Sequence, residues 1–267
     1  MWLKRELASP SMVELMAEPD RLLERSNCVI IKDQRKIKVG RVPLQWDGQK
    51  IVVYIKRYNA FSLRYRLQSM VACSGAQKSL RGAAILSAVG VSTARPVAAI
   101  EHHRGGLLLQ SFYVSEEIAD GKTVDAYWKE KLVTLPARLG AQRRRRFLQK
   151  LAGLFSRLHD RDVYHNDLKD ANILIAPRGG APEESFFLLD LEGVRRGARL
   201  SRSRRIKNLV QLNRTLGKHL KPSERWYFLT CYLSAQGIDR QTKKRWAADI
   251  HRQSVGLDKI KSIDHVS

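Results

Sequence analysis

The sequence predicts an α+β fold with two lobes, in which a small antiparallel sheet comes first and a mainly helical part follows. Short segments of alternating apolar residues recur up to about residue 118, and beyond it apolar residues return at helical spacing. The 267 residues, 43% of them hydrophobic, are enough to bury the core of one large domain or of two small lobes. We expect a helical extension over residues 1–27, a sheet lobe over 28–118 and a helical lobe over 119–267.

The first lobe is expected to contain strands and one helix. A charged, helix-like stretch that ends near Glu24 precedes it. The Asp47-Gly48 and Gly105-Gly106 pairs are typical turn residues. Residues 74–89 follow a helical pattern that ends at Gly90. The strands are expected at 28–32, 36–42, 51–58, 97–100 and 107–114.

The second lobe begins with an amphipathic helix behind four arginines at 143–146, and this helix is expected to stop at His159. Its apolar face consists of Phe147, Leu148, Leu151, Leu154, Phe155 and Leu158. A polar loop, a strand, a turn, a second strand and mainly helix should follow, at 163–172, 173–175, 177–182, 186–189 and about 203–260.

The most informative segment reads YHNDLKDANILI over residues 164–175 and is followed by LLDLEG over 188–193. This is the catalytic-loop form H-x-D-L-K-x-x-N, with an apolar strand, a turn and a second strand that ends in aspartate. A lone H-x-D would be weak, because an aspartate in a loop is more often a cap or turn residue. The whole combination is specific, and it predicts a protein-kinase-like fold and ATP-dependent phosphoryl transfer.

Phosphoryl transfer needs a positioned hydroxyl, a metal ion on the phosphates and positive charge near the migrating group. Asp167 is the candidate that accepts a hydrogen bond from the attacking hydroxyl, and Lys169 can reach the γ-phosphate from the same loop. Asn172 and Asp190 supply the hard oxygen ligands that suit Mg²⁺. We therefore predict Asp167 and Lys169 as catalytic residues and Asn172 and Asp190 as metal ligands.

The lysine that contacts the phosphates of ATP is expected at the end of a strand in the first lobe. Lys56 ends the strand IVVYIK and is our candidate, although it could also be an ordinary exposed strand-end lysine. Lys32, Lys36 and Lys38 are the alternatives. Residues 114–118 fit the hinge whose backbone would contact adenine.

Two features of typical protein kinases are missing from the first lobe. No G-x-G-x-x-G precedes Lys56, and no acidic residue occurs between Asp47 and Glu101. The helix after Lys56 therefore cannot supply the usual glutamate partner. Gln77 could take its place by hydrogen bonding, or Lys56 could pair with Asp190, and the departure favours a weakened or inactive enzyme.

The composition predicts an anionic partner. The chain has 49 Lys and Arg against 26 Asp and Glu, a formal charge of +23. Nucleic acid, an anionic membrane surface and a phosphorylated substrate are the candidates, beside a protein that is simply basic. Since no recognised nucleic-acid motif occurs, we expect no nucleic-acid partner.

Localisation is expected to be cytoplasmic. The N-terminus lacks the apolar core of a secretory signal, and no run of about 18 uncharged apolar residues occurs, so any membrane contact should be peripheral. Cys28, Cys73 and Cys231 lack the spacing of a zinc site and are interpreted as reduced thiols.

From about residue 50 to 233 the chain resembles the lipopolysaccharide kinase (Kdo/WaaP/InaA) family of bacterial kinase-like proteins. The resemblance rests on GVSTARPVA at 90–98, YVSEE at 113–117, the catalytic segment, RIKNLVQLNR at 205–214 and SERWYFL at 223–229. It implies ATP-dependent phosphorylation of Kdo or heptose in the lipopolysaccharide inner core, at the cytoplasmic face of the inner membrane. It also implies that Asp167 is the catalytic and Asp190 the metal-binding aspartate.

A basic stretch after Asp190 is the candidate for docking the acceptor. Seven cations follow one another there without an acidic residue among them, and they are Arg195, Arg196, Arg199, Arg202, Arg204, Arg205 and Lys207. Such a run is commonly a solvated surface, but an inner-core acceptor and anionic lipids would attract it. We predict acceptor and membrane docking by Arg204 and Arg205.

Two other functions stay open. The catalytic loop alone would also suit a protein Ser/Thr kinase, although no A-P-E follows Asp190 and the helical pattern resumes soon after it. The charge would also suit a non-catalytic basic binding protein on a kinase scaffold. Retention of four polar catalytic-loop and metal residues, Asp167, Lys169, Asn172 and Asp190, favours an enzyme.

Overall fold

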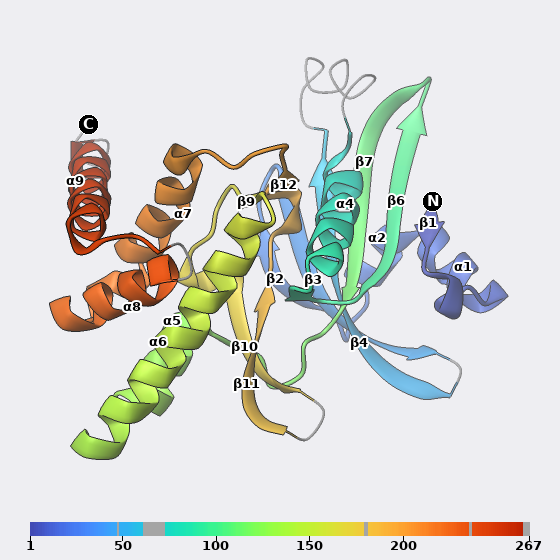
Figure 1. Cartoon of the computed structure of the whole chain (residues 1–267). Coiled ribbons are helices and arrows are strands. Elements are labelled where there is room, and N and C mark those ends of the chain that lie inside the picture. Colours follow the sequence, from blue (N-terminus) through green and yellow to red (C-terminus); the bar gives the residue numbers. More distant parts are fainter. Residues whose placement is uncertain (47, 61–72, 179–180, 235–236, 264–267) are drawn as a thin grey trace. The chain divides into compact units, whose positions relative to one another are not determined.

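A computed structural model describes residues 1–46, 48–60, 73–178, 181–234 and 237–263 of the chain (Figure 1). It divides into two compact units. The first comprises Met1–Ala84, Thr93–Ala119 and Leu191–Val194, and the second comprises Ile85–Ser92, Asp120–Asp190 and Arg195–Ser267. Each unit therefore contains segments that are distant in the sequence.

The first unit contains an antiparallel sheet of six strands in the order β1-β6-β7-β4-β3-β2. Its strands are β1 (Trp2–Leu3), β2 (Val29–Asp33), β3 (Ile37–Trp46), β4 (Gln49–Asn59), β6 (Pro96–Arg104) and β7 (Leu107–Glu116). The five strands expected from alternation are confirmed, four of them with longer bounds and β2 shifted by one residue, whereas β1 was not expected. The helix expected over 74–89 is α4 (Gly75–Ala88).

The N-terminal residues belong to the core of this unit. The charged stretch expected as one helix is divided into η1 (Arg5–Leu7), α1 (Pro10–Ala17) and α2 (Pro19–Leu23), because a proline cannot continue a helix. Ser9 caps α1 by accepting the Met12 backbone N–H. The buried side chains of this region, among them Met12, Met16 and Leu22, pack in one cluster with Val53 and Ile55 of β4.

Strand β4 separates two environments because its side chains alternate. Val53 and Ile55 face the cluster formed with the N-terminal helices. Lys56 and Tyr58 have the opposite parity, and Tyr58 contacts α4, where its hydroxyl is 2.9 Å from that of Ser79. Lys56 therefore lies on the α4 side of the sheet.

The second unit is mainly helical (Figure 1). Its longest helices are α6 (Ala137–Asp160), which buries the six predicted apolar residues, and α9 (Arg240–Ile263). The helical region expected after residue 203 consists of α7 (Arg202–Arg214), η5 (Leu216–His219), α8 (Pro222–Ser234) and α9. The shorter helical segments are α5 (Val124–Tyr127), the π-helix η2 (Trp128–Leu132), and the 3-10 helices η3 (Asp170–Asn172) and η4 (Leu191–Gly193), of which η4 belongs to the first unit.

Two small sheets complete the fold. The first has the order β5-β11-β10-β8, and the second pairs β9 with β12. These strands are β5 (Ser92–Thr93), β8 (Lys122–Thr123), β9 (Val163–His165), β10 (Ile173–Arg178), β11 (Ala181–Leu188) and β12 (Val194–Arg196). The loop expected over 163–172 therefore begins with a strand, β9, which pairs with β12. The local sequence does not indicate this strand, because β12 lies about 30 residues further along the chain. Among the helices of the described ranges, none has the length and apolar character needed to cross a membrane.

Candidate active site

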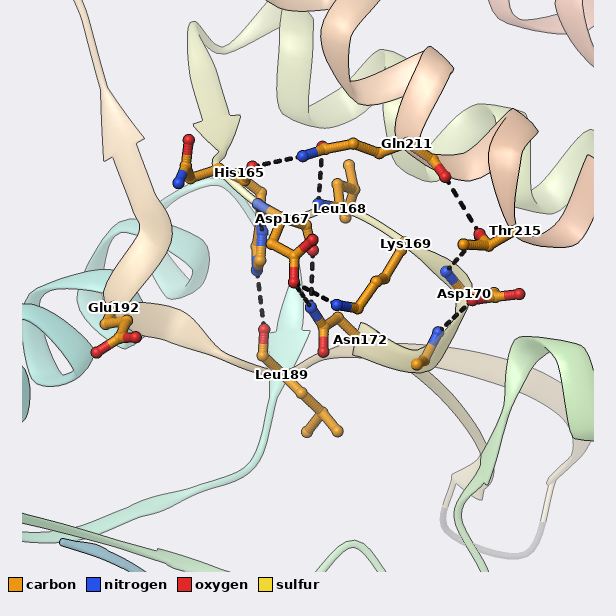
Figure 2. A network of polar contacts seen from close by, with 12 residues as sticks. His165, Asp167, Leu168, Lys169, Asp170, Asn172, Leu189, Glu192, Gln211 and Thr215 are labelled. Atoms are coloured by element: carbon orange, nitrogen blue, oxygen red, sulfur yellow. Dashed lines mark hydrogen bonds and ion pairs between the residues drawn. The ribbon is translucent and has the colours of Figure 1, made fainter. Parts of the chain in front are cut away.

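The predicted catalytic residues of the loop lie together between β9 and β10 (Figure 2). Nζ of Lys169 is 2.6 Å from Oδ2 of Asp167. Nδ2 of Asn172 donates to the same Oδ2 at 3.1 Å and to the Asp167 carbonyl oxygen at 2.7 Å. The Asp167 carboxylate is thus fixed by a cation and an amide, while its side chain is 43% exposed and accessible to a substrate.

These contacts determine which atoms are suited to chemistry. Both donors bind Oδ2 of Asp167, so Oδ1 is the oxygen suited to a substrate hydroxyl. Because Nδ2 of Asn172 is committed to Asp167, the amide presents Oδ1 as its acceptor atom. An amide oxygen in this orientation fits a hard metal ion such as Mg²⁺.

Asp190 follows β11 and is joined to the loop through its neighbour. The backbone N–H of Leu189 donates to the Asn172 carbonyl at 2.9 Å. Asp190 itself has a φ of 55°, which is uncommon for a residue other than glycine. Conformations of this kind cluster at functional sites, where surrounding contacts hold them. The predicted metal residues Asn172 and Asp190 are therefore carried by segments that the backbone binds together.

His165 connects the same two segments (Figure 2). Its Nε2 donates to the Leu189 carbonyl at 2.8 Å, and its Nδ1 accepts the Asp167 backbone N–H at 3.2 Å. A ring that donates through one nitrogen and accepts through the other is neutral. Burial lowers the pKa of His165, and this effect outweighs the nearby carboxylates of Asp190 and Asp167, which raise it. The arrangement keeps the imidazole uncharged at neutral pH.

Helix α7 binds the backbone of the loop through three polar residues on one face. Nδ2 of Asn208 donates to the His165 carbonyl at 2.5 Å. Gln211 donates from Nε2 to the Asn166 carbonyl at 2.5 Å, and its Oε1 accepts the Leu168 N–H at 3.0 Å. The hydroxyl of Thr215 lies 3.4 Å from the Asp170 backbone nitrogen, which donates to it (Figure 2). The loop is therefore held at four backbone positions between residues 165 and 170 by α7 and its C-cap residue Thr215.

A second histidine, His159, contacts Asn208 of α7. His159 of α6 lies with Nε2 3.2 Å from Oδ1 of Asn208 and with Nδ1 2.8 Å from the Tyr232 hydroxyl. Since the amide oxygen only accepts, Nε2 carries the proton and Nδ1 accepts from the tyrosine. Burial lowers the pKa of His159 to about 4 and raises the pKa of Tyr232 to about 12. Both groups are thus neutral supports of Asn208.

The predicted docking residues Arg204 and Arg205 point to different surroundings. The Arg204 guanidinium and the Lys207 ammonium each lie 5.7 Å from the centre of the Tyr164 ring. Lys207 also lies 3.4 Å from Oδ1 of Asn166, the residue before Asp167. Arg205 instead pairs with Asp160 at 3.0 Å and donates to the His159 carbonyl at 2.8 Å, with 18% of its side chain exposed. These contacts give Arg205 a structural role.

In the first unit, Lys56 lies in the middle of the sheet, paired with Val39 of β3 and Tyr113 of β7. Its Nζ is 4.0 Å from Oε1 of Glu192 and 5.0 Å from the centre of the Tyr58 ring. Gln77, one of the two alternatives considered for a partner, donates to Glu101 at 3.1 Å. A carboxylate beside Lys56 is therefore supplied by the residue two positions after Asp190.

The predicted hinge is fastened to the sheet by an ion pair. Glu117 accepts two hydrogen bonds from Arg41 of β3, at 2.7 and 2.8 Å. The Tyr54 hydroxyl lies 3.5 Å from the same carboxylate. The hydrogen bonds from Arg41 lower the pKa of Glu117. This pair fixes the end of the hinge strand against β3.

Several of these residues were not identified from the sequence. Asn208, Gln211 and Thr215 recur at spacings of three and four, so the signal for one polar helix face was present. Glu192 had a weaker signal, since its partner Lys56 is distant in the sequence. His159 and Tyr232 could not be paired from the sequence at all, because nothing in it relates α6 to α8.

Comparisons with known proteins bear on the fold and the family of the chain. A solved structure described as WaaP in complex with acyl carrier protein is similar to the chain, with a TM-score of 0.67 and 20% sequence identity, over 96% of this chain and 99% of that one. No curated protein matches the chain. The similarity to WaaP shows the kinase-like fold that the sequence predicted. The family model of lipopolysaccharide kinases (Kdo/WaaP) matches residues 49–232, more than half of the chain. The chain therefore belongs to the lipopolysaccharide kinase (Kdo/WaaP) family.

Proposed function

We propose that this protein transfers the γ-phosphate of ATP to a sugar hydroxyl of the lipopolysaccharide inner core, on Kdo or heptose, or of a related glycolipid. The observation that carries the proposal is the Asp167 carboxylate, held by Lys169 at 2.6 Å and Asn172 at 3.1 Å in a loop of a lipopolysaccharide kinase family member. Family membership supports the phosphotransferase class, and the sugar acceptor is our own assignment.

In this proposal Asp167 orients the acceptor. Its Oδ1 accepts the hydrogen bond of the attacking hydroxyl and takes up the proton as the new bond to phosphorus forms and ADP leaves. Lys169 keeps Oδ2 of Asp167 in place and has further N–H groups for the oxygens of the γ-phosphate. One salt-bridged pair thus positions both the nucleophile and the group that it attacks.

The nucleotide and its metal ion are assigned to the residues that the sequence predicts for them. Lys56 would contact the phosphates of ATP, and the backbone of the hinge segment would contact adenine. Asn172, through Oδ1, and Asp190 would hold Mg²⁺, since both offer the oxygen ligands that this ion prefers. Bound Mg²⁺ would neutralise charge on the phosphates during transfer.

We assign acceptor docking to Arg204, and we add Lys207 because both cations lie over the Tyr164 ring close to the catalytic loop. Phosphate and carboxylate groups of an inner-core acceptor would bind to this pair. The charge of +23 further supports peripheral binding to the anionic, cytoplasmic face of the inner membrane. Each nearby cation adds roughly 1 kcal/mol of attraction to such a surface.

Acyl carrier protein is a further partner that we propose to test. The solved WaaP structure contains it. Co-purification of the two proteins would test for a complex. Titration of purified acyl carrier protein into the purified protein would then measure the affinity. A complex of defined stoichiometry is expected, and no binding at low salt would remove the partner from the proposal.

The test of the function is mass spectrometry of the core oligosaccharide from a bacterial host that lacks this protein. We expect one phosphate to be missing, and to return with the wild-type gene and with the control Asp33→Asn, whose carboxylate lies on edge strand β2. Asp167→Asn should not restore it. An unchanged core in the deletion host would overturn the sugar-kinase proposal and direct the search to protein substrates. Full restoration by Asp167→Asn would favour the non-catalytic alternative.

A further inference from the structure

Helix α4 presents small residues to the strand that carries Lys56 and to the turn η4. Gly75, Ser79 and Gly82 lie on one helix face, since they are spaced by four and three positions. A Cβ atom added to Gly75 would lie 2.5 Å from the Tyr58 ring, and one added to Gly82 would lie 2.2 Å from the Leu191 carbonyl oxygen. This face is packed at backbone distance and has no space for a glutamate side chain.

Ser79 occupies the middle of this face. It is 1% exposed, and its hydroxyl is engaged with that of Tyr58 at 2.9 Å. The Tyr58 ring in turn lies 5.0 Å from Nζ of Lys56. The helix therefore supports Lys56 through an aromatic ring and offers it no carboxylate.

The close approach at Gly82 brings η4 against the helix, and η4 carries Glu192. Oε1 of Glu192 lies 4.0 Å from Nζ of Lys56. We propose that Glu192 is the positioning residue of Lys56 and replaces the acidic residue that α4 lacks. The inference rests on the proposed function, because it takes Lys56 as the lysine that contacts the phosphates of ATP.

The Lys56–Glu192 pair is expected to fix the position of the Lys56 ammonium and to add little to the stability of the fold. The side chain of Glu192 is 34% exposed and that of Lys56 is 21% exposed, and ion pairs with solvent access contribute little to folding. A lysine has a flexible stem of four methylene groups, so a carboxylate beside it restricts where the ammonium can be. Glu192 would thus hold Lys56 ready for the nucleotide.

Gln77 is one of the two alternative partners, beside Asp190, and provides the matched control. Its amide carries no charge, and it is bound to Glu101 at 3.1 Å. If Glu192 holds Lys56, Gln77→Ala should leave nucleotide binding unchanged. Glu192→Gln removes the charge and keeps the size of the side chain, so it should leave the melting temperature close to that of the wild type.

The experiment measures Mg²⁺-ATP binding by calorimetry, without any acceptor, for wild type, Glu192→Gln, Lys56→Met and the double variant. We expect Glu192→Gln to weaken binding about tenfold, the scale of the coupling between two residues in contact. The double variant should bind no more weakly than Lys56→Met, because a residue that acts through Lys56 has no effect once Lys56 is gone.

Two outcomes would overturn the inference. Equal binding by wild type and Glu192→Gln would exclude the role, and fully additive losses in the double variant would make Glu192 a residue that acts independently of Lys56. Both differ from failure of the proposed function, in which the wild type itself would bind no Mg²⁺-ATP.

Gly82→Ala provides a second test that does not touch the ion pair. Its Cβ would displace the Leu191 carbonyl and with it the turn that carries Glu192. We expect a loss of ATP affinity similar to that of Glu192→Gln, and no further loss when the two changes are combined. If a folded Gly82→Ala variant bound ATP as tightly as wild type, the contact of Gly82 with Leu191 would not determine the position of Glu192.

Discussion

The backbone N–H of Asp167 donates to Nδ1 of His165 across 3.2 Å, so the position of the aspartate depends on a histidine that must accept this bond. The opposite nitrogen of the ring is committed to the Leu189 carbonyl at 2.8 Å. The imidazole can make both bonds only in its neutral form with the proton on Nε2. The catalytic loop and the strand that leads to Asp190 are aligned by this one ring.

His165→Ala should therefore lower kcat by about tenfold or more, since it removes the side-chain bonds of two part-buried backbone groups, the Asp167 N–H and the Leu189 carbonyl. The KM for ATP should change much less, because the ring does not face the nucleotide phosphates in the proposed mechanism. Steady-state kinetics measures both values, and His103→Ala, an exposed histidine of β6, is the control. A variant with normal kcat would show that the ring does not position Asp167.

Protonation of His159 should make stability depend on pH. Its pKa is about 4 in the folded protein, below the ordinary value of 6.5, so the unfolded chain binds more protons between these values. Stability is then fully present above pH 6.5 and is lost as the pH falls towards 4, by roughly 2 kcal/mol between pH 7 and pH 5. The lowered pKa of His165 acts in the same direction.

Urea unfolding at pH 7 and pH 5 measures this loss. In His159→Gln the dependence on pH should be smaller than in wild type, although the variant is less stable at pH 7. His103→Gln should retain the full dependence. If wild type and His159→Gln lost the same free energy of unfolding between pH 7 and pH 5, the assignment of His159 as the titrating group would be contradicted.

Removing the side-chain amide of Gln211 should loosen the catalytic loop. Gln211→Leu removes the bonds of the exposed Asn166 carbonyl and of the Leu168 N–H. The N–H belongs to a buried residue, and a cost of about 1–3 kcal/mol for that group predicts a fall in kcat of about tenfold. Gln211→Glu keeps an acceptor for the Leu168 N–H, so its kcat should lie between those of wild type and Gln211→Leu. The control is Gln149→Leu on the exposed side of α6, and equal kcat values for both leucine variants would exclude a positioning role.

The neighbours Arg204 and Arg205 should differ when they are replaced. Arg204→Glu is expected to raise the KM for a lipidated acceptor and to make binding less sensitive to salt, with little change for ATP. Lys207→Glu should act in the same way. Arg205→Gln should instead lower the melting temperature, because it breaks the contacts with Asp160 and the His159 carbonyl. Acceptor kinetics at low and high salt provide the measurement, and an unchanged acceptor KM in Arg204→Glu would end the docking assignment.

The sequence predicted five of the six strands of the first unit's sheet, and the catalytic segment, because both depend on local spacing. Alternation specifies strands, and the fixed distances from His165 to Asn172 bring polar groups to one loop. The different surroundings of Arg204 and Arg205 follow from the helix, where consecutive residues point about 100° apart. The count of charges over residues 195–207 does not reveal this difference.

The partner of Lys56 could not be predicted, because it depends on contact between distant segments. The absence of an acidic residue between Asp47 and Glu101 was visible, and the alternatives considered were Gln77 and Asp190. Glu192 comes into reach only through the packing of Leu191 against Gly82, which no local pattern describes. The support of Asn208 by His159 and Tyr232 has the same origin.

The interleaving of the two units has a consequence for synthesis of the chain. The first unit includes Leu191–Val194, so it cannot be completed until the ribosome has made the whole catalytic segment. Strand β1 must likewise wait for β6, with which Trp2 pairs at Ala99. Domains often fold in order from the N-terminus during translation. Here β1 remains without its partner strand until more than a third of the 267 residues have been made, and neither unit can be obtained intact by cutting the gene at one point.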